Sequence, residues 1–213
     1  MFQILQAPYL PSQANLLDRM FRLRKRVFVD QLQWSVSAIN GRERDCYDDC
    51  QPVYILWTDD LTGELLGSTR LMPTTGPTLM YDVFRDTFPH GAALEAPGIW
   101  EATRTCVDAE ALARCQPDLS ACEAFGRLCL AIVECGLQHG IHTVVSNYEP
   151  HMMRIYRKAG LIVDELGRAD GYGRRPVCCG AFAITTDVAG TVRAQLGVSE
   201  TLITLPAMDK MAA

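Results

Sequence analysis

The sequence has little positive charge, and this shortage removes one class of partner. Its 20 Lys and Arg stand against 25 Asp and Glu, which gives a formal net charge of −5. A chain with this balance has no basic field to attract a nucleic-acid backbone. We therefore expect that it does not bind nucleic acid.

Long apolar runs are also missing. No stretch approaches the roughly 20 apolar residues that cross a bilayer. The first residues, MFQILQAPYLPSQ, lack the basic start and long apolar centre of a signal peptide. These features predict a cytoplasmic protein that has no membrane partner.

The sequence contains nine cysteines but no Cys-x-x-Cys pair. An odd count without a secretion signal indicates reduced thiols and not a disulfide scaffold. Cys46 and Cys50 have no histidine pair near them, and His139 and His142 lie in a different segment. No metal site is expected, because the usual zinc-ligand spacing is absent.

Strand and helix signals alternate along the chain. With 213 residues and 48% hydrophobic content, the chain can bury one core, so we expect a single domain, residues 1–213. Expected strands cover residues 2–7, 53–58, 65–72, 98–107, 141–148 and 174–185. Expected helices cover residues 16–34, 120–139 and 150–159, a last helix is expected from 187, and residues 35–52 are expected to form a loop. This order predicts an α/β (α+β) fold with a mixed central sheet flanked by helices.

Several charged residues interrupt apolar segments. At about 100° per residue, Arg24 falls near the middle of the apolar face of helix 16–34, where a guanidinium needs an anionic partner. Arg70 lies within an apolar strand. In the strand 98–107, simple alternation sends Glu101 to one face and Arg104 to the other. These charges predict either a buried ion-pair network or a polar binding site.

The charged and aromatic residues of the first half form an ordered set. The set is Arg24, Phe28, Trp34, Asp45, Asp48, Arg70, Phe84, Glu101 and Arg104. It resembles the signature of the LuxI-type N-acyl-homoserine-lactone synthases, the autoinducer synthases, whose fold is similar to that of the GCN5-related N-acetyltransferases. The resemblance implies an acyltransferase that acylates the amine of S-adenosylmethionine and then closes the lactone, releasing methylthioadenosine.

The resemblance also implies substrates and residue roles. The substrates are S-adenosylmethionine and an acyl thioester, either acyl-CoA or acyl-carrier protein, with no cofactor. Glu101 is implied as the general base. The residues implied for S-adenosylmethionine are Arg24, Phe28, Trp34, Asp45, Asp48, Arg70 and Arg104, since this substrate offers a carboxylate, an ammonium and a sulfonium.

Purely structural roles for the same residues stay open as alternatives. Arg24 could form a structural salt bridge with Asp45 or Asp48, although the resemblance favours the substrate carboxylate. Glu101 and Arg104 could belong to a buried structural network.

The second half, together with Phe84 of the first half, is expected to supply the acyl pocket, and the second half the contact with the donor. The acyl-pocket candidates are Phe84, Thr143, Ser146 and Tyr148. Alternation points Thr143 away from Ser146 and Tyr148, so all of them cannot line one wall. The candidate carrier-docking residues are Arg154, Arg157 and Lys158, on one short helix. This basic group is small beside the net charge of −5, which favours acyl-CoA as the donor.

Two other functions compete with this interpretation. One is an ordinary GCN5-type acyl-CoA N-acyltransferase, but the segment CQPDLSACEAFG lacks the Gly-rich turn that grips a pyrophosphate. The other is a non-catalytic small-molecule binding module on the same scaffold. The presence of Glu101, Arg24 and Asp45 argues against that module.

Overall fold

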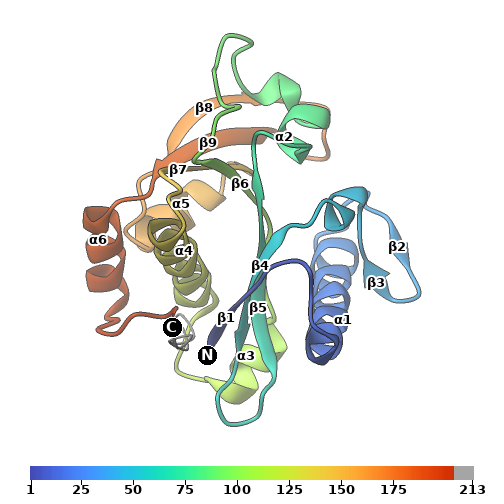
Figure 1. Ribbon diagram of the computed structural model, residues 1–213, viewed down its shortest axis with the longest axis vertical. Coiled ribbons are helices and arrows are strands. Elements are labelled where there is room, and N and C mark those ends of the chain that lie inside the picture. Colours follow the sequence, from blue (N-terminus) through green and yellow to red (C-terminus); the bar gives the residue numbers. More distant parts are fainter. Residues whose placement is uncertain (204–213) are drawn as a thin grey trace, which may run out of the picture.

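The computed structural model describes residues 1–203. A seven-stranded sheet lies at the centre of the molecule (Figure 1). Its strands, in spatial order, are β1 (Phe2–Leu5), β4 (Val53–Thr58), β5 (Leu65–Pro73), β6 (Ile99–Val107), β7 (Thr143–Tyr148), β9 (Val177–Ala183) and β8 (Asp164–Ala169). The β6–β7 pair is parallel, and the other neighbours in this sheet are antiparallel. The predicted mixed sheet is therefore confirmed.

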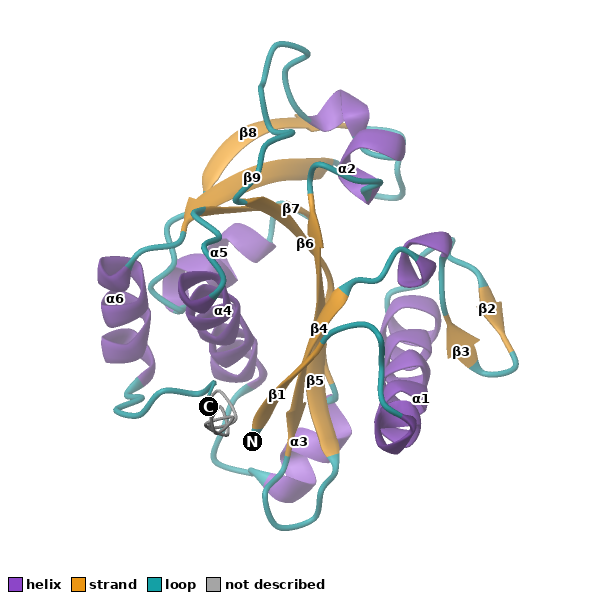
Figure 2. Cartoon of the chain, viewed as in Figure 1, coloured by secondary structure: helices purple, strands orange, loops and turns teal. Residues whose placement is uncertain are grey.

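Helices cover both faces of the sheet (Figure 2). They are α1 (Ala14–Arg24), α2 (Leu79–Asp82), α3 (Ala109–Cys115), α4 (Ala121–Gln138), α5 (Met152–Lys158) and α6 (Thr186–Leu196). The helices α4, α5 and α6 lie on one side, and α1 lies on the other beside the small hairpin β2 (Ala38–Ile39) and β3 (Arg42–Glu43). None of the helices in residues 1–203 is long and apolar enough to cross a membrane.

The long helix α4 forms the centre of the main core. A capping box opens this helix: the Ser120 hydroxyl accepts a bond from the Glu123 amide at 3.2 Å, and the Glu123 carboxylate accepts one from the Ser120 amide. At the other end of α4, buried Glu134 accepts backbone N–H bonds from Leu202 and Ile203 and pairs with Arg193. Glu134 therefore anchors the segment that follows α6.

The first predicted helix differs from expectation in its second half. The chain is α-helical to Arg24, then forms a π-helix over Lys25–Gln31. A π-helix is wider than an α-helix, so the apolar arc does not continue at 100° per residue. Leu32 and Trp34 are consequently 47% and 37% exposed, although they lie within the predicted helix 16–34.

Several elements were not predicted from the sequence. The expected loop 35–52 contains the β2–β3 hairpin and a 3-10 turn, Cys46–Asp49. Strand β8 is polar, with the sequence DELGRA, and α2 and α3 are only one or two turns long. Short or polar elements leave no apolar period to recognise.

A bulge in β6 overturns the expected placement of its charges. The register between β5 and β6 shifts after Ser68, and Arg104 adopts a positive φ of 55°. The extra residue turns Arg104 to the face that already carries Arg70 and Glu101. The prediction that Glu101 and Arg104 point to opposite faces is therefore wrong, because strict alternation does not survive a bulge.

Candidate active site

Asp48 receives most of the bonds in a buried ion-pair network. Its carboxylate accepts two bonds from the Arg24 guanidinium, at 2.8 and 2.9 Å, and one from Arg70 at 2.8 Å. The Tyr54 hydroxyl donates a further bond at 2.7 Å. Burial alone would raise the pKa of Asp48, but the two arginines hold that pKa well below its usual range. Asp48 is therefore a fixed anion.

Glu43 is a member of this network that the sequence did not reveal. It is fully buried, accepts a bond from Arg24 Nε at 2.6 Å, and lies 3.1 Å from the Arg104 guanidinium. Its sequence context, GRERD, is typical of an exposed turn. The need of Arg24 for an anion was the only signal, and it did not distinguish Glu43 from the neighbouring acids.

Asp45 lies at the partly open edge of the network. It pairs with Arg70, and its Oδ2 accepts a bond from Arg104 Nη2 at 2.8 Å. The Asp45 and Arg104 side chains are 18% and 9% exposed, whereas Arg70 is fully buried. Three arginines thus face three carboxylates, so the network is charge-balanced on its own.

Aromatic rings border the same edge. Phe28 and Trp34 are stacked with their centroids 5.0 Å apart, and the Arg104 guanidinium lies over the Phe28 ring at 5.6 Å. Such rings can face an adenine or a sulfonium.

Glu101 is a buried acid beside the network. Its two oxygens accept backbone N–H bonds from Leu79 and Met80 of α2, at 3.1 and 2.6 Å. Burial raises the pKa of Glu101 to about 7, and these N–H bonds together with the charges of Arg70 and Arg104 oppose a larger rise. A carboxyl with this pKa can accept a proton near neutral pH.

The contacts of Arg24 match the structural alternative that the sequence left open. Its guanidinium is 1% exposed and is occupied by Asp48 and Glu43. To bind a substrate carboxylate directly, Arg24 would have to break these ion pairs.

The structure separates the four predicted acyl-pocket residues. Strands β6 and β7 pair only over Ile99–Glu101 and Thr143–Val145, and a narrow cavity of about 10 Å³ lies next to the point where they part. Its lining residues are Ala102, Thr105, Phe125, Cys129, Ile132, Ser146, Tyr156 and Phe182. Of the predicted residues, only Ser146 lines this cavity, and its hydroxyl bonds to the Ala102 carbonyl at 2.9 Å.

The other three lie elsewhere. Tyr148 is buried against Tyr156, with ring centroids 5.4 Å apart. The Thr143 hydroxyl lies 2.9 Å from His142. Phe84 contacts Tyr172 near α2, at a centroid distance of 5.0 Å.

The three predicted docking residues are together on the surface. Arg154, Arg157 and Lys158 are exposed on α5, and none of them makes an ion pair within residues 1–203. In the same part of the chain, no group of three or more His, Cys, Asp or Glu is placed to hold a metal ion.

The fold is shared with acetyltransferases. The solved structure of a protein assigned as an N-acetyltransferase from Lactobacillus plantarum gives a TM-score of 0.54 at 18% identity, covering 86% of this chain and 99% of that chain. The predicted GCN5-related architecture is therefore confirmed. Fold and site together define an α/β protein with an acetyltransferase-like fold and a buried acid beside an arginine and carboxylate network.

The family follows from closer similarities. The autoinducer synthase family model matches residues 8–189. An acyl-homoserine-lactone synthase of Rhizobium etli is 35% identical over 201 residues, covering 92% of this chain and 90% of that protein. The structure of BjaI, a CoA-dependent acyl-homoserine lactone synthase, with MTA gives a TM-score of 0.81 at 26% identity, covering 94% of this chain and 91% of that chain.

The chain belongs to the autoinducer synthase family. The prediction of an enzyme, an acyltransferase of this family, is confirmed.

Proposed function

We propose that this protein makes N-acyl-homoserine lactones from S-adenosylmethionine and an acyl thioester, as a signal for quorum sensing. The observation that carries the proposal is Glu101, a buried acid with a raised pKa beside a charge-balanced network. Similarity to BjaI with SAM and isopentyl-CoA, at 27% identity and a TM-score of 0.78, supports the substrate pair.

The reaction has two bond exchanges. The amine nitrogen of S-adenosylmethionine bonds to the thioester carbon, the carbon–sulfur bond of the thioester breaks, and the thiol leaves. Glu101 takes the proton that the amine must lose, directly or through a water. The substrate carboxylate then bonds to its own γ-carbon, and the electrons of the breaking carbon–sulfur bond neutralise the sulfonium, releasing methylthioadenosine.

The partly exposed residues are the best placed to touch S-adenosylmethionine. Asp45 can face the ammonium, and Arg104, whose Nε and Nη2 bond Glu43 and Asp45, can face the carboxylate with its Nη1. Trp34, which is 37% exposed, can face the adenine or the sulfonium, and the buried ring of Phe28 supports it by stacking. The buried members, Arg24, Arg70, Asp48 and Glu43, then hold these groups in position.

We assign the acyl chain to the cavity between β6 and β7. Its lining is mainly apolar, and Thr105, Ser146 and Tyr156 are its hydroxyl-bearing members. A cavity of about 10 Å³ admits little more than one water. A short or branched acyl group therefore needs less rearrangement of Phe125 and Phe182 than a long chain.

The proposal includes a single domain and a cytoplasmic location, where the free thiols stay reduced.

Purified protein tests the proposal directly. Incubation with S-adenosylmethionine and a series of acyl-CoA thioesters should release methylthioadenosine and yield acyl-homoserine lactones, both measured by mass spectrometry. Acylation of another amine without use of S-adenosylmethionine would instead favour an ordinary acyl-CoA N-acyltransferase. Binding without any turnover would favour a non-catalytic module.

We expect acyl-CoA to be preferred over acyl-carrier protein carrying the same acyl group. The α5 cations Arg154, Arg157 and Lys158 form a small patch on a chain of net charge −5, which offers limited attraction for an acidic carrier. The measurement is kcat/KM for both donors, with Arg154→Glu compared with the exposed control Arg114→Glu on α3. A carrier preference that collapses at high salt and in Arg154→Glu, but not in the control, would contradict the expectation.

A further inference from the structure

Two exposed thiols lie at the ends of the turn that carries Asp48, one of the network carboxylates. Cys46 begins the 3-10 turn Cys46–Asp49 and Cys50 follows it, and both are exposed free cysteines. The Cys50 Sγ lies 3.6 Å from the Cys46 carbonyl oxygen. The other seven cysteines are buried or half-buried, so this pair is the most accessible to thiol reagents.

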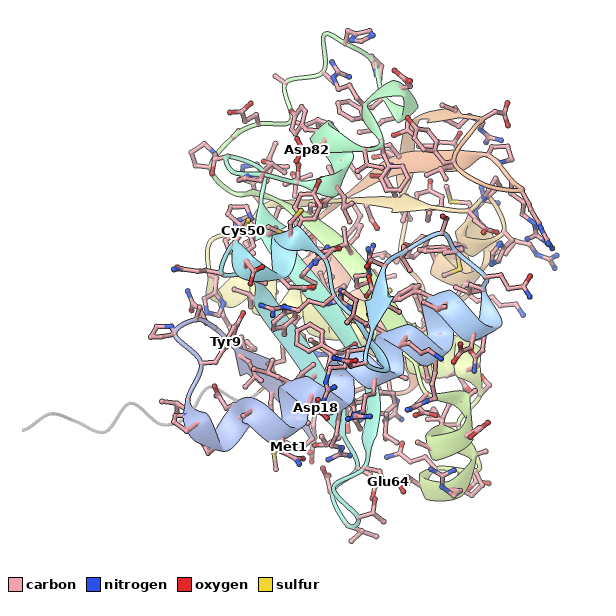
Figure 3. The ribbon with its side chains drawn as sticks, turned by 90° about the vertical axis from the view of Figure 1, so that its right-hand side faces the viewer. Met1, Tyr9, Asp18, Cys50, Glu64 and Asp82 are labelled. Atoms are coloured by element: carbon pink, nitrogen blue, oxygen red, sulfur yellow. The ribbon has the colours of Figure 1, made fainter. Side chains whose placement is uncertain are left out.

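The turn between these thiols connects the two parts of the candidate site. On one side, Asp48 binds Arg24 and Arg70. On the other side, the Tyr47 hydroxyl donates a bond to Asp82 Oδ2 at 3.0 Å. Asp82 is the last residue of α2, whose amides hold Glu101. Figure 3, seen from the side of α1, shows Cys50 and Asp82 above that helix.

A disulfide between Cys46 and Cys50 cannot form without changing this turn. A 3-10 helix rises about 2.0 Å per residue, so four residues advance about 8 Å along its axis. The Cα atoms of a disulfide are usually roughly 4.4–6.8 Å apart. Closure must therefore tighten or unwind the segment that presents Asp45, Tyr47 and Asp48.

We propose that Cys46 and Cys50 are a reversible oxidation site that switches off the active site when glutathione disulfide accumulates. One cysteine thiolate attacks glutathione disulfide, forming a mixed disulfide and releasing one glutathione thiolate. The second cysteine thiolate displaces the other glutathione, closing the Cys46–Cys50 bond. Two protons and two electrons pass from the cysteine pair to glutathione disulfide, which becomes two glutathione thiols.

The effect on catalysis rests on the proposed function, whereas the formation of the disulfide does not. Displacement of Asp48 would unbalance Arg24 and Arg70, and displacement of Tyr47 would disturb α2 and Glu101. Misplacement of catalytic groups by about 1 Å costs up to roughly a hundredfold in rate. We expect oxidation to reduce turnover by at least about tenfold.

The test compares the full-length protein before and after treatment with glutathione disulfide. Peptide mass spectrometry should find a Cys46–Cys50 disulfide, and methylthioadenosine release should fall by at least about tenfold and return on addition of dithiothreitol. Cys46→Ser and Cys50→Ser should keep the activity of the reduced protein and resist the treatment. The control Cys115→Ser, which alters a half-buried thiol on α3, should remain sensitive.

Three results would overturn the proposal. These are a stable mixed disulfide with glutathione in place of the internal bond, an oxidised protein that keeps full activity, and inhibition that persists in both serine variants. Activity of the reduced protein reports separately on the proposed function. If the reduced protein were inactive, a Cys46–Cys50 bond and a shifted thermal midpoint would still report on the oxidation site.

Discussion

Replacing Glu101 with glutamine should slow methylthioadenosine release by roughly a hundredfold or more, the scale of a lost general base. Glutamine preserves the size of the side chain but cannot take the amine proton. The rate of the unmodified protein should rise with pH and level off above about 7, because burial raises the pKa of Glu101 to about 7 and the base acts when deprotonated. Initial rates of methylthioadenosine release, measured below and above pH 7, report both the loss in the variant and the pH dependence of the unmodified protein.

Glu134→Gln provides a matched control. Glu134 is also buried and also accepts two backbone N–H bonds, but it lies at the far end of α4. Both variants remove a buried carboxylate, but only Glu101→Gln should lose turnover. Near-normal rates in Glu101→Gln would exclude the general-base role.

Stability offers a second measure of the raised pKa. Because the pKa of Glu101 is raised on folding, the folded protein holds a proton that the unfolded chain releases. That contribution is present below the unfolded pKa, and it is lost as pH rises through about 7. Unmodified protein should therefore lose stability relative to Glu101→Gln between about pH 5 and about pH 8.

Arg24→Ala should destabilise the fold by about 3–5 kcal/mol, because buried Asp48 and Glu43 then keep one cation each and the network is one positive charge short. Denaturant unfolding measures this change. Affinity for S-adenosylmethionine should fall as a consequence of the displaced network. The control Arg22→Ala removes an exposed arginine of the same helix and should change stability by no more than about 0.5 kcal/mol.

If Arg24 instead binds the substrate carboxylate directly, its removal should affect substrate affinity more than stability. A direct contact with the substrate carboxylate would reduce affinity in calorimetry while the unfolding midpoint stayed close to that of the unmodified protein. Arg24→Ala therefore distinguishes the two roles that the sequence left open.

Much of the fold could be predicted from the sequence because its main elements have strong local signals. The hairpin β4–β5 follows from two apolar runs around a Gly-containing turn. Helix α4 follows from the Ser120 capping box and its apolar face. By contrast, β8 and α2 have no periodic pattern, so their placement depends on contacts with distant residues.

Part of the candidate site could also be predicted from the sequence. The signature residues of the first half could be recognised by their order, and the structure brings Asp45, Asp48, Arg70 and Arg104 into one network. Glu43 was missed because a buried acid in a charged loop looks like a surface residue. The prediction of which face carries Arg104 was wrong because a bulge depends on the register with β5. The sequence of one strand alone does not reveal that register.

The charge balance of the network has a consequence for substrate binding. Three arginines already offset three carboxylates, so the net positive charge of S-adenosylmethionine has no surplus anion to meet. Glu101 can supply that anion by releasing its proton, since its pKa is about 7. On the proposed function, uptake of the substrate cation and loss of a proton to solvent are linked, and each promotes the other. The substrate thereby generates the base that its own amine requires.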